Sequence, residues 1–204
     1  MTLANPFRYP TAIHVRKHGP IGYSKYEYFR PWLRDEFDFR CVYCLWREVW
    51  SHALSVFEID HFVAQATDET RKLQYANLVY ACHNCNKRKS KKSVLDPATH
   101  PYGACIRVLE SGKIEALNDD GVRLIDDFAL DQPKITEARA RFIQWARSFE
   151  KNDWDQFLKL MGFPPKLPDL ENLEHRPKSN IKEDGIRQSW FQRKKRGDLP
   201  AFFE

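Results

Sequence analysis

Three segments decide the fold of this 204-residue chain: Cys41-Val-Tyr-Cys44, Phe57-Glu-Ile-Asp-His-Phe62 and Cys82-His-Asn-Cys85. A Cys-x2-Cys turn can place two thiolates on one ion, and two such turns complete a tetrahedral four-cysteine site, the usual arrangement for structural zinc. Because such a site leaves no open coordination position, we expect this zinc to hold structure rather than to perform chemistry. The expected ligands of one zinc ion per chain are Cys41, Cys44, Cys82 and Cys85.

The alternative for these cysteines is a pair of disulfides, or four unrelated buried thiols. Disulfides need an oxidising compartment. Residues 1–8 lack the apolar stretch of a signal peptide, and no run of about 18 apolar residues exists that could span a membrane. We therefore expect a cytoplasmic protein with no membrane contact, in which zinc is favoured. The fifth cysteine, Cys105, lies outside the pattern and is expected to be a small buried hydrophobe.

Residues 57–62, between the cysteine pairs, alternate between two faces as the residues of a short strand do. Adjacent residues on a strand point to opposite faces, so Asp60 and His61 can share one site only if the chain turns there. Asn77 precedes an apolar run, and Asn86 lies at the expected start of a helix. Each of these residues alone could cap a turn or helix or lie on the surface. Their order inside the cysteine frame favours a catalytic role.

From residue 32 to residue 92 the chain resembles the HNH endonuclease family, whose core is the ββα-metal fold. The family pattern is a cysteine pair, an acidic strand ending in Asp-His, an Asn-Leu, and a second pair followed by His or Asn and then Lys. Here Asn86 replaces the last His, and the loop at 63–68 lacks the Pro and paired glycines often seen there. The resemblance implies a ββα-metal core held together by the four-cysteine zinc site. With the local patterns in the rest of the chain, the expected fold is α+β: this core, then a β-hairpin and helices, then an extended C-terminal tail.

The resemblance also implies metal-dependent hydrolysis of DNA phosphodiester bonds, leaving 5′-phosphate and 3′-hydroxyl ends. Asp60 and Asn86 would hold one catalytic Mg²⁺ or Mn²⁺, which stabilises the developing charge. His61 would be the general base, and Asn77 would hold it in one orientation. His83, inside the second cysteine turn, would be a DNA or metal contact or simply an exposed residue. The expected phosphate contacts are Lys87, Arg88 and Lys89.

The net charge of +5 is modest but unevenly placed, with basic clusters at 86–92 and 193–196. Basic clusters with neighbouring aromatic residues suit phosphate and base contacts, although either could be a solvated face. The first cluster adjoins the expected site, so we expect it on DNA. Trp190 and Phe191 stand beside the second cluster and offer an apolar anchor, which favours a protein partner there.

The rest of the chain carries weaker signals. Alternating runs around Ser111-Gly112 predict a hairpin, and residues 118–121 predict a turn. Apolar residues at helical spacing over 135–161 predict two helices with a break at 152–153. The expected organisation is a basic arm over DNA or a partner at 1–30, the HNH nuclease core at 31–95, a hairpin-plus-helix extension packed on it at 96–163, and an extended basic tail at 164–204.

The sequence therefore favours an HNH endonuclease acting on DNA, expected to be duplex. It shows no sequence-reading module, so specificity or regulation could come from a protein partner, as in the nuclease subunit of a phage-defence or mobile-element system. One alternative is a non-catalytic zinc-stabilised module that binds nucleic acid or protein. Another is an RNA substrate, because no residue here excludes the ribose 2′-hydroxyl.

Overall fold

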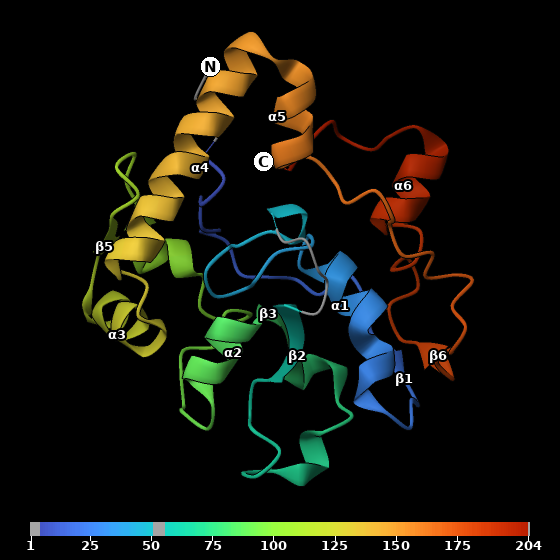
Figure 1. Cartoon of the computed structure of the whole chain (residues 1–204). Helices are drawn as coiled ribbons and strands as arrows, with labels where there is room; N and C mark the ends of the chain where they lie inside the picture. The colour runs from blue at the N-terminus through green and yellow to red at the C-terminus, as the bar shows by residue number, and fades with distance from the viewer. Residues whose placement is uncertain (1–4, 51–55, 204) are drawn as a thin grey trace.

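The centre of the molecule is a two-stranded hairpin followed at once by a helix. The computed structural model describes residues 5–50 and 56–203. Strand β2 (Phe57–His61) pairs antiparallel with β3 (Leu78–Cys82), and α2 (His83–Lys89) begins at the next residue (Figure 1). This confirms the expected ββα core within an α+β fold.

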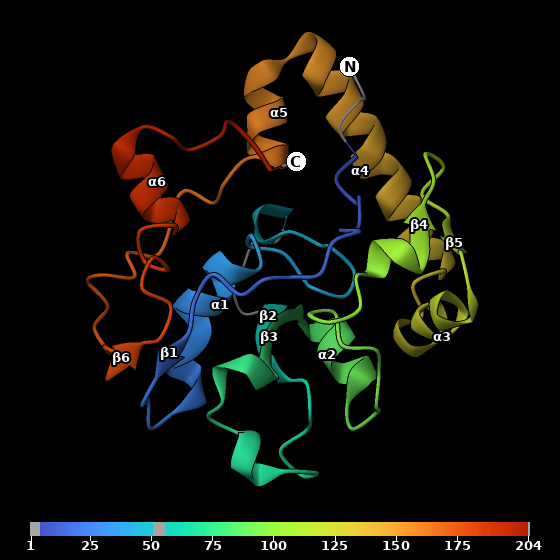
Figure 2. The same ribbon diagram turned by 180° about the vertical axis from the view of Figure 1, so that it is seen from behind.

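A short helix and the N-terminal arm cover one side of this core. Helix α1 (Arg30–Glu36) follows the 3₁₀ turn Tyr26–Phe29 and has a proline in its first turn, where proline is well tolerated. Strand β1 (Pro20–Ile21) pairs with β6 (Ser179–Asn180), so the arm and the C-terminal region meet (Figure 2). The remaining 3₁₀ turns of the described residues are η2 (Glu48–Trp50), η4 (Glu69–Arg71), η5 (Tyr75–Asn77) and η6 (Tyr102–Ala104).

The arm is fastened to α1 by buried ionic groups. The backbone N–H groups of Lys17 and His18 donate to the Glu36 carboxylate at 2.9 and 3.0 Å, and the imidazole of His18 lies 2.7 Å from Asp35. His18, Asp35 and Glu36 are buried. Part of the arm's polar character is therefore used inside the fold and is not left for a partner.

The extension follows the predicted order. Strands β4 (Ile106–Val108) and β5 (Ile114–Ala116) form the hairpin, and Gly112 adopts a φ of 77° in the connection. That left-handed conformation is one that glycine adopts without strain. Helices α4 (Pro133–Asn152) and α5 (Trp154–Met161) meet at Asp153, which confirms the predicted break.

The prediction of a plain turn at 118–121 was wrong. Asn118 caps a helix, α3 (Asp119–Phe128), by accepting a hydrogen bond from the Gly121 N–H at 3.0 Å. Leu124, Ile125 and Phe128 form its buried face. Asn and Asp favour helix starts as well as turns, so the local signal does not separate the two structures.

The C-terminal region also differs from the expected extended tail, because it contains β6 and helix α6 (Trp190–Arg196). The Trp190 ring lies 5.0 Å from that of Phe163 and 5.5 Å from that of Phe203, and its indole N–H donates to Asp38 at 3.0 Å. The proposed anchor for a partner is thus an intramolecular contact.

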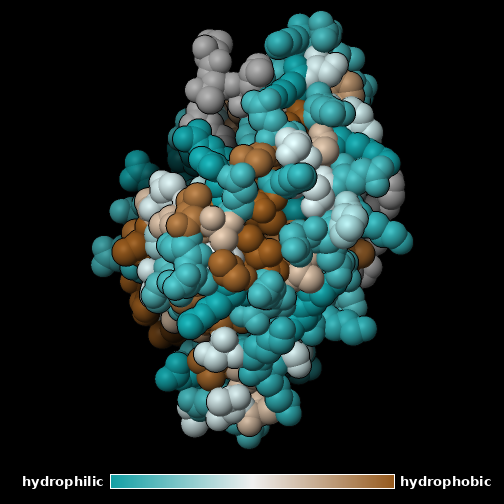
Figure 3. All heavy atoms as spheres, turned by 90° about the vertical axis from the view of Figure 1, so that its left-hand side faces the viewer, coloured by the Kyte–Doolittle hydropathy of each residue, from teal (hydrophilic) through white to brown (hydrophobic). Residues whose placement is uncertain are grey.

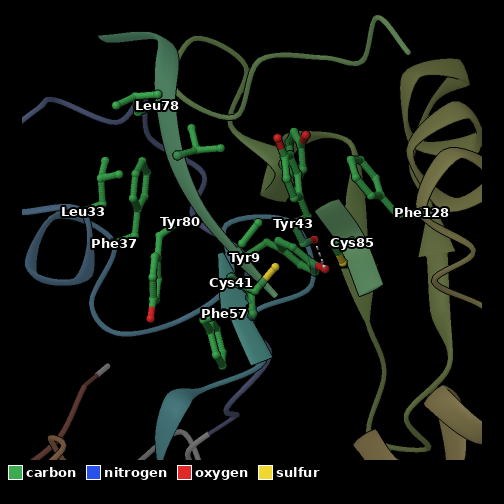
Figure 4. Packing of buried hydrophobic residues seen from close by; sticks show 14 of the residues in the cluster. Tyr9, Leu33, Phe37, Cys41, Tyr43, Phe57, Leu78, Tyr80, Cys85 and Phe128 are labelled. Atoms are coloured by element: carbon green, nitrogen blue, oxygen red, sulfur yellow. Dashed lines mark hydrogen bonds between the residues drawn. The ribbon is translucent and has the colours of Figure 1, made fainter. Parts of the chain in front are cut away.

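The main core is formed by α1, the hairpin and the first cysteine turn, and it continues to buried residues of β4, α3 and α4 (Figure 4). Phe57 stacks on Tyr80 at 5.1 Å, and the Tyr9 hydroxyl donates to the Tyr43 carbonyl at 2.9 Å. A smaller cluster of Ala146, Phe157 and Met161 joins α4 to α5. None of the helices in the described part of the chain is long and apolar enough to cross a membrane.

Candidate functional site: a zinc centre beside an acidic strand

The four predicted cysteines converge. Their Sγ atoms all lie within 4.8 Å of one another, and those of Cys44 and Cys82 are 3.7 Å apart. Zn–S bonds of about 2.3 Å in a tetrahedron put sulfurs about 3.8 Å apart, so a small contraction would close the site on zinc. Cys82 ends β3 and Cys85 lies in the first turn of α2, so the ion would fasten the helix to the hairpin. Cys105 is free, buried and outside the cluster, as predicted.

The four cysteines shift one another's pKa values. Hydrogen bonds among the sulfurs lower the pKa of Cys82 and raise the pKa of both Cys44 and Cys85. In each case the hydrogen bond with Cys41 has the largest effect. One thiolate is thus stabilised by its neighbours, while further deprotonation is opposed. A divalent cation removes this opposition, because it compensates the added negative charge.

Asp60 points into the protein. Its carboxylate accepts hydrogen bonds from the Tyr43 hydroxyl at 2.5 Å and from the Lys89 ammonium at 3.0 Å, and only 4% of the residue is exposed. Burial raises the pKa of Asp60, although Lys89 and Tyr43 oppose the shift. Both carboxylate oxygens are therefore occupied by protein donors.

Lys89 is not a surface residue, contrary to the expected phosphate contact. Its ammonium donates to Asp60 and, at 2.8 Å, to the backbone carbonyl of His61, and the residue is only 1% exposed. Its position on the inner side of α2 explains the difference. Lys87 is exposed and Arg88 is half-buried, so these two remain available to a polyanion.

His61 lies on the opposite face of β2 from Asp60, since the chain is still extended there. Its Nε2 lies 3.1 Å from the Lys72 carbonyl oxygen, and its Nδ1 lies 3.1 Å from the Gln65 side-chain amide. A carbonyl oxygen can only accept a hydrogen bond, so the ring nitrogen beside it, Nε2, carries the proton. Nδ1 then carries the lone pair. Burial lowers the pKa of His61, so the ring is neutral near pH 7.

Asn77 holds the loop that carries these partners. Its side-chain oxygen accepts from the Val63 N–H at 2.8 Å, and its amide donates to the carbonyls of Val63 and Arg71 at 3.1 and 3.3 Å. Asn77 thus closes the loop after His61 and places the Lys72 carbonyl. These three side-chain hydrogen bonds of Asn77 go to backbone atoms of the loop and not to the His61 ring.

Asn86 meets a residue to which the sequence analysis gave no role. Glu58 accepts from the Asn86 amide at 2.5 Å and lies 2.7 Å from His83 Nδ1. Burial acts to raise the pKa of Glu58, but the hydrogen bonds from His83 and Asn86 outweigh it and lower that pKa. Within the described residues, no hydrogen bond joins Asn86 to Asp60 or to His61. The alternation of residues along β2 places Glu58 on the same face as Asp60, and this was the sequence signal that could have identified Glu58 as a site residue.

Tyr26 packs against His61. Its ring lies 4.9 Å from that of His61 in an edge-to-face contact, and the negative charge of Glu58 contributes to the raised pKa of its hydroxyl, after burial and Glu27. Nothing in the local sequence around Tyr26 indicated this placement.

A cavity of about 490 Å³ opens next to the cysteine cluster, between α2, the end of α3 and α4. Its walls include Trp46, Phe128 and Ile135, with Arg88 and Lys134 also lining it. Figure 3, which views the side of α3 and α4, shows hydrophobic atoms gathered among hydrophilic ones on this face.

Residues 41–92 match the family model described as HNH endonuclease, so this segment, about a quarter of the chain, belongs to the HNH endonuclease family. Neither the curated proteins nor the solved structures gave a match to this chain.

Proposed function

We propose that this protein is a metal-dependent endonuclease that hydrolyses phosphodiester bonds of duplex DNA. The observation that carries the proposal is His61, which lies within the HNH segment and is neutral and oriented. Its Nε2 proton is engaged by the Lys72 carbonyl, so Nδ1 is the atom that takes a proton from water. The Gln65 amide, 3.1 Å from Nδ1, would have to release that atom before it takes the proton.

The remaining residues divide between positioning and charge. Asn77 keeps the loop at 63–72 in place, and Lys87 and Arg88 neutralise backbone phosphates. Asn86, whose amide donates to Glu58 in this structure, would offer its side-chain oxygen to a hard divalent cation. When bound, that cation stabilises the charge that develops on the phosphate oxygens. The expected ligand Asp60 could contribute only if Lys89 released it.

Target choice is proposed to depend on a protein partner, because the described residues include no recognisable sequence-reading module. A nuclease subunit of a phage-defence or mobile-element system would fit this requirement. A partner would also restrain an activity that is otherwise harmful to its own cell.

The test is cleavage of supercoiled plasmid by zinc-loaded protein, with and without Mg²⁺ or Mn²⁺. His61→Ala should lose about 10² to 10⁴ in rate while binding DNA normally. His100→Ala, a change of an exposed histidine far along the chain, is the matched control and should cut like the wild type. DNA binding without cleavage in the presence of either metal would favour the non-catalytic module. Cleavage of RNA but not of DNA would show that the substrate is RNA.

A further inference from the structure

The cavity between α2, α3 and α4 has a buried arginine in its wall. Arg139 belongs to α4 and is only 2% exposed, yet it lines the cavity. Its Nη2 donates to the backbone carbonyl of Leu130. Its Nε is buried and has no hydrogen-bond partner within residues 5–50 and 56–203. A buried donor without an acceptor is costly, so an acceptor brought by a ligand would stabilise it.

Two further cations line the same cavity. Lys134 is exposed in the first turn of α4, and Arg88 is half-buried on α2. In the part of the chain that the structure describes, neither of them makes an ion pair with a carboxylate, and neither does Arg139. Three unpaired cations around one concave surface create a positive potential that attracts an anion.

Most of the remaining wall is apolar. It includes the rings of Phe7, Trp46 and Phe128 and the side chain of Ile135. The volume of about 490 Å³ lies within the range of about 300–1,000 Å³ that is usual for small-molecule sites. Apolar surface gains free energy when it is removed from water. The cavity is therefore suited to a ligand with an apolar body as well as a negative charge.

The zinc centre limits the charge of such a ligand. Cys44, Cys82 and Cys85 also line the cavity, and four thiolates on one Zn²⁺ leave a net negative charge there. Asp131 adds a further negative influence on Arg139. A phosphate monoester carries about two negative charges at pH 7 and would be repelled more than a carboxylate, which carries one.

We propose that this cavity binds a small carboxylate with an apolar body, held at its charged end by Arg139, Lys134 and Arg88. The planar guanidinium fork of an arginine matches the two oxygens of a carboxylate. Neither His61 nor Asn77 lines the cavity, so binding there does not depend on the proposed hydrolysis. Arg88 is the residue that the cavity shares with the proposed phosphate contacts.

The experiment measures binding of octanoate to zinc-loaded protein by isothermal titration calorimetry, without DNA. Octanoate should bind, 1-octanol should bind at least about 10-fold more weakly, and octylammonium should not bind measurably. From hexanoate to octanoate the affinity should rise about fourfold for each added CH₂ group, because each group is buried against apolar wall. Equal affinities for octanoate and 1-octanol, or no binding of octanoate, would overturn the proposal.

Variants place the ligand in this cavity. Ala138→Phe fills it without changing a charge and should abolish octanoate binding. Arg139→Met should weaken binding about 10- to 100-fold, the loss typical of a hydrogen bond to a charged group. Should that variant fail to fold by circular dichroism, Lys134→Met changes an exposed cation and should weaken binding at least about threefold.

Arg123→Met is the matched control, because Arg123 is an exposed arginine of α3 that does not line the cavity, and it should bind octanoate like the wild type. Wild-type affinity in folded Ala138→Phe would place the ligand elsewhere and overturn the proposal. Wild-type affinity in the folded cation variants would overturn it as well.

Discussion

Replacing Lys89 by Met should destabilise the protein strongly, because it leaves the buried carboxylate of Asp60 without its positively charged partner. The ammonium lies 3.0 Å from Asp60 Oδ1, and both side chains are almost fully buried, at 1% and 5% exposed. At an effective dielectric constant of about 20, two unit charges at this separation interact by roughly 5 kcal/mol. Removal of one partner of a buried pair typically costs about 3–5 kcal/mol, and we expect a loss in that range.

The double change Lys89→Met with Asp60→Asn should recover most of that loss, since no charge is then left unpaired. The deficit of the single variant should also depend on pH. Burial raises the pKa of Asp60 in the folded protein, and loss of Lys89 raises it further. The folded state then binds a proton that the unfolded chain releases, so the variant loses stability as pH rises above the unfolded-state pKa of about 3.9.

The assay is urea denaturation of zinc-loaded protein at pH 5 and pH 8, followed by far-ultraviolet circular dichroism. Lys87→Met is the control, because Lys87 is exposed on the same helix and should change the free energy of unfolding by no more than about 0.5 kcal/mol. A loss below about 1 kcal/mol for Lys89→Met, or a double variant as unstable as the single one, would refute the buried-pair argument.

Three further outcomes are expected. The purified protein should contain one zinc ion, and Cys82→Ser should lose both zinc and the folded state; a folded, zinc-free preparation by metal analysis would contradict this. Cleavage should fall with acid through the lowered pKa of His61, so the rate should be nearly flat from pH 7 to 8; a rate still rising tenfold per pH unit there would assign the base to another group. Changing Lys87 and Arg88 to Ala should flatten the dependence of log affinity on log salt by about 0.9 per lost phosphate contact, while changes at 193–196 should leave it unaltered; an unchanged slope after the first pair would move DNA away from α2.

The local sequence was sufficient for the central elements. Paired cysteines at short spacing allow few structures in a chain of this kind, and they predicted the cluster that Cys41 and Cys85 help to form. Alternation predicted β2, and helical spacing with a break at 152–153 predicted α4 and α5. These signals are local, because periodicity along a segment reports its own secondary structure.

The functional assignments needed more than local signals. The sequence placed Asp60 and Asn86 on one ion, but contacts of Lys89 and Tyr43 across the fold turn Asp60 inward. Glu58 gained its partners only because the hairpin register sets it beside the first turn of α2. Which oxygens stay free is decided by side chains distant in sequence, and pattern alone does not report them.

The same distinction explains the ends of the chain. Composition alone identified the arm as basic and the last forty residues as rich in proline and charge. The pairing of β1 with β6 joins segments more than a hundred residues apart. The packing of Trp190 on Phe163 and Phe203 joins aromatic rings whose pairing no local pattern predicts. Such contacts depend on the whole fold bringing those surfaces together, which is why the sequence determined the four-cysteine core and only the tertiary structure decided which charges and rings remain exposed for function.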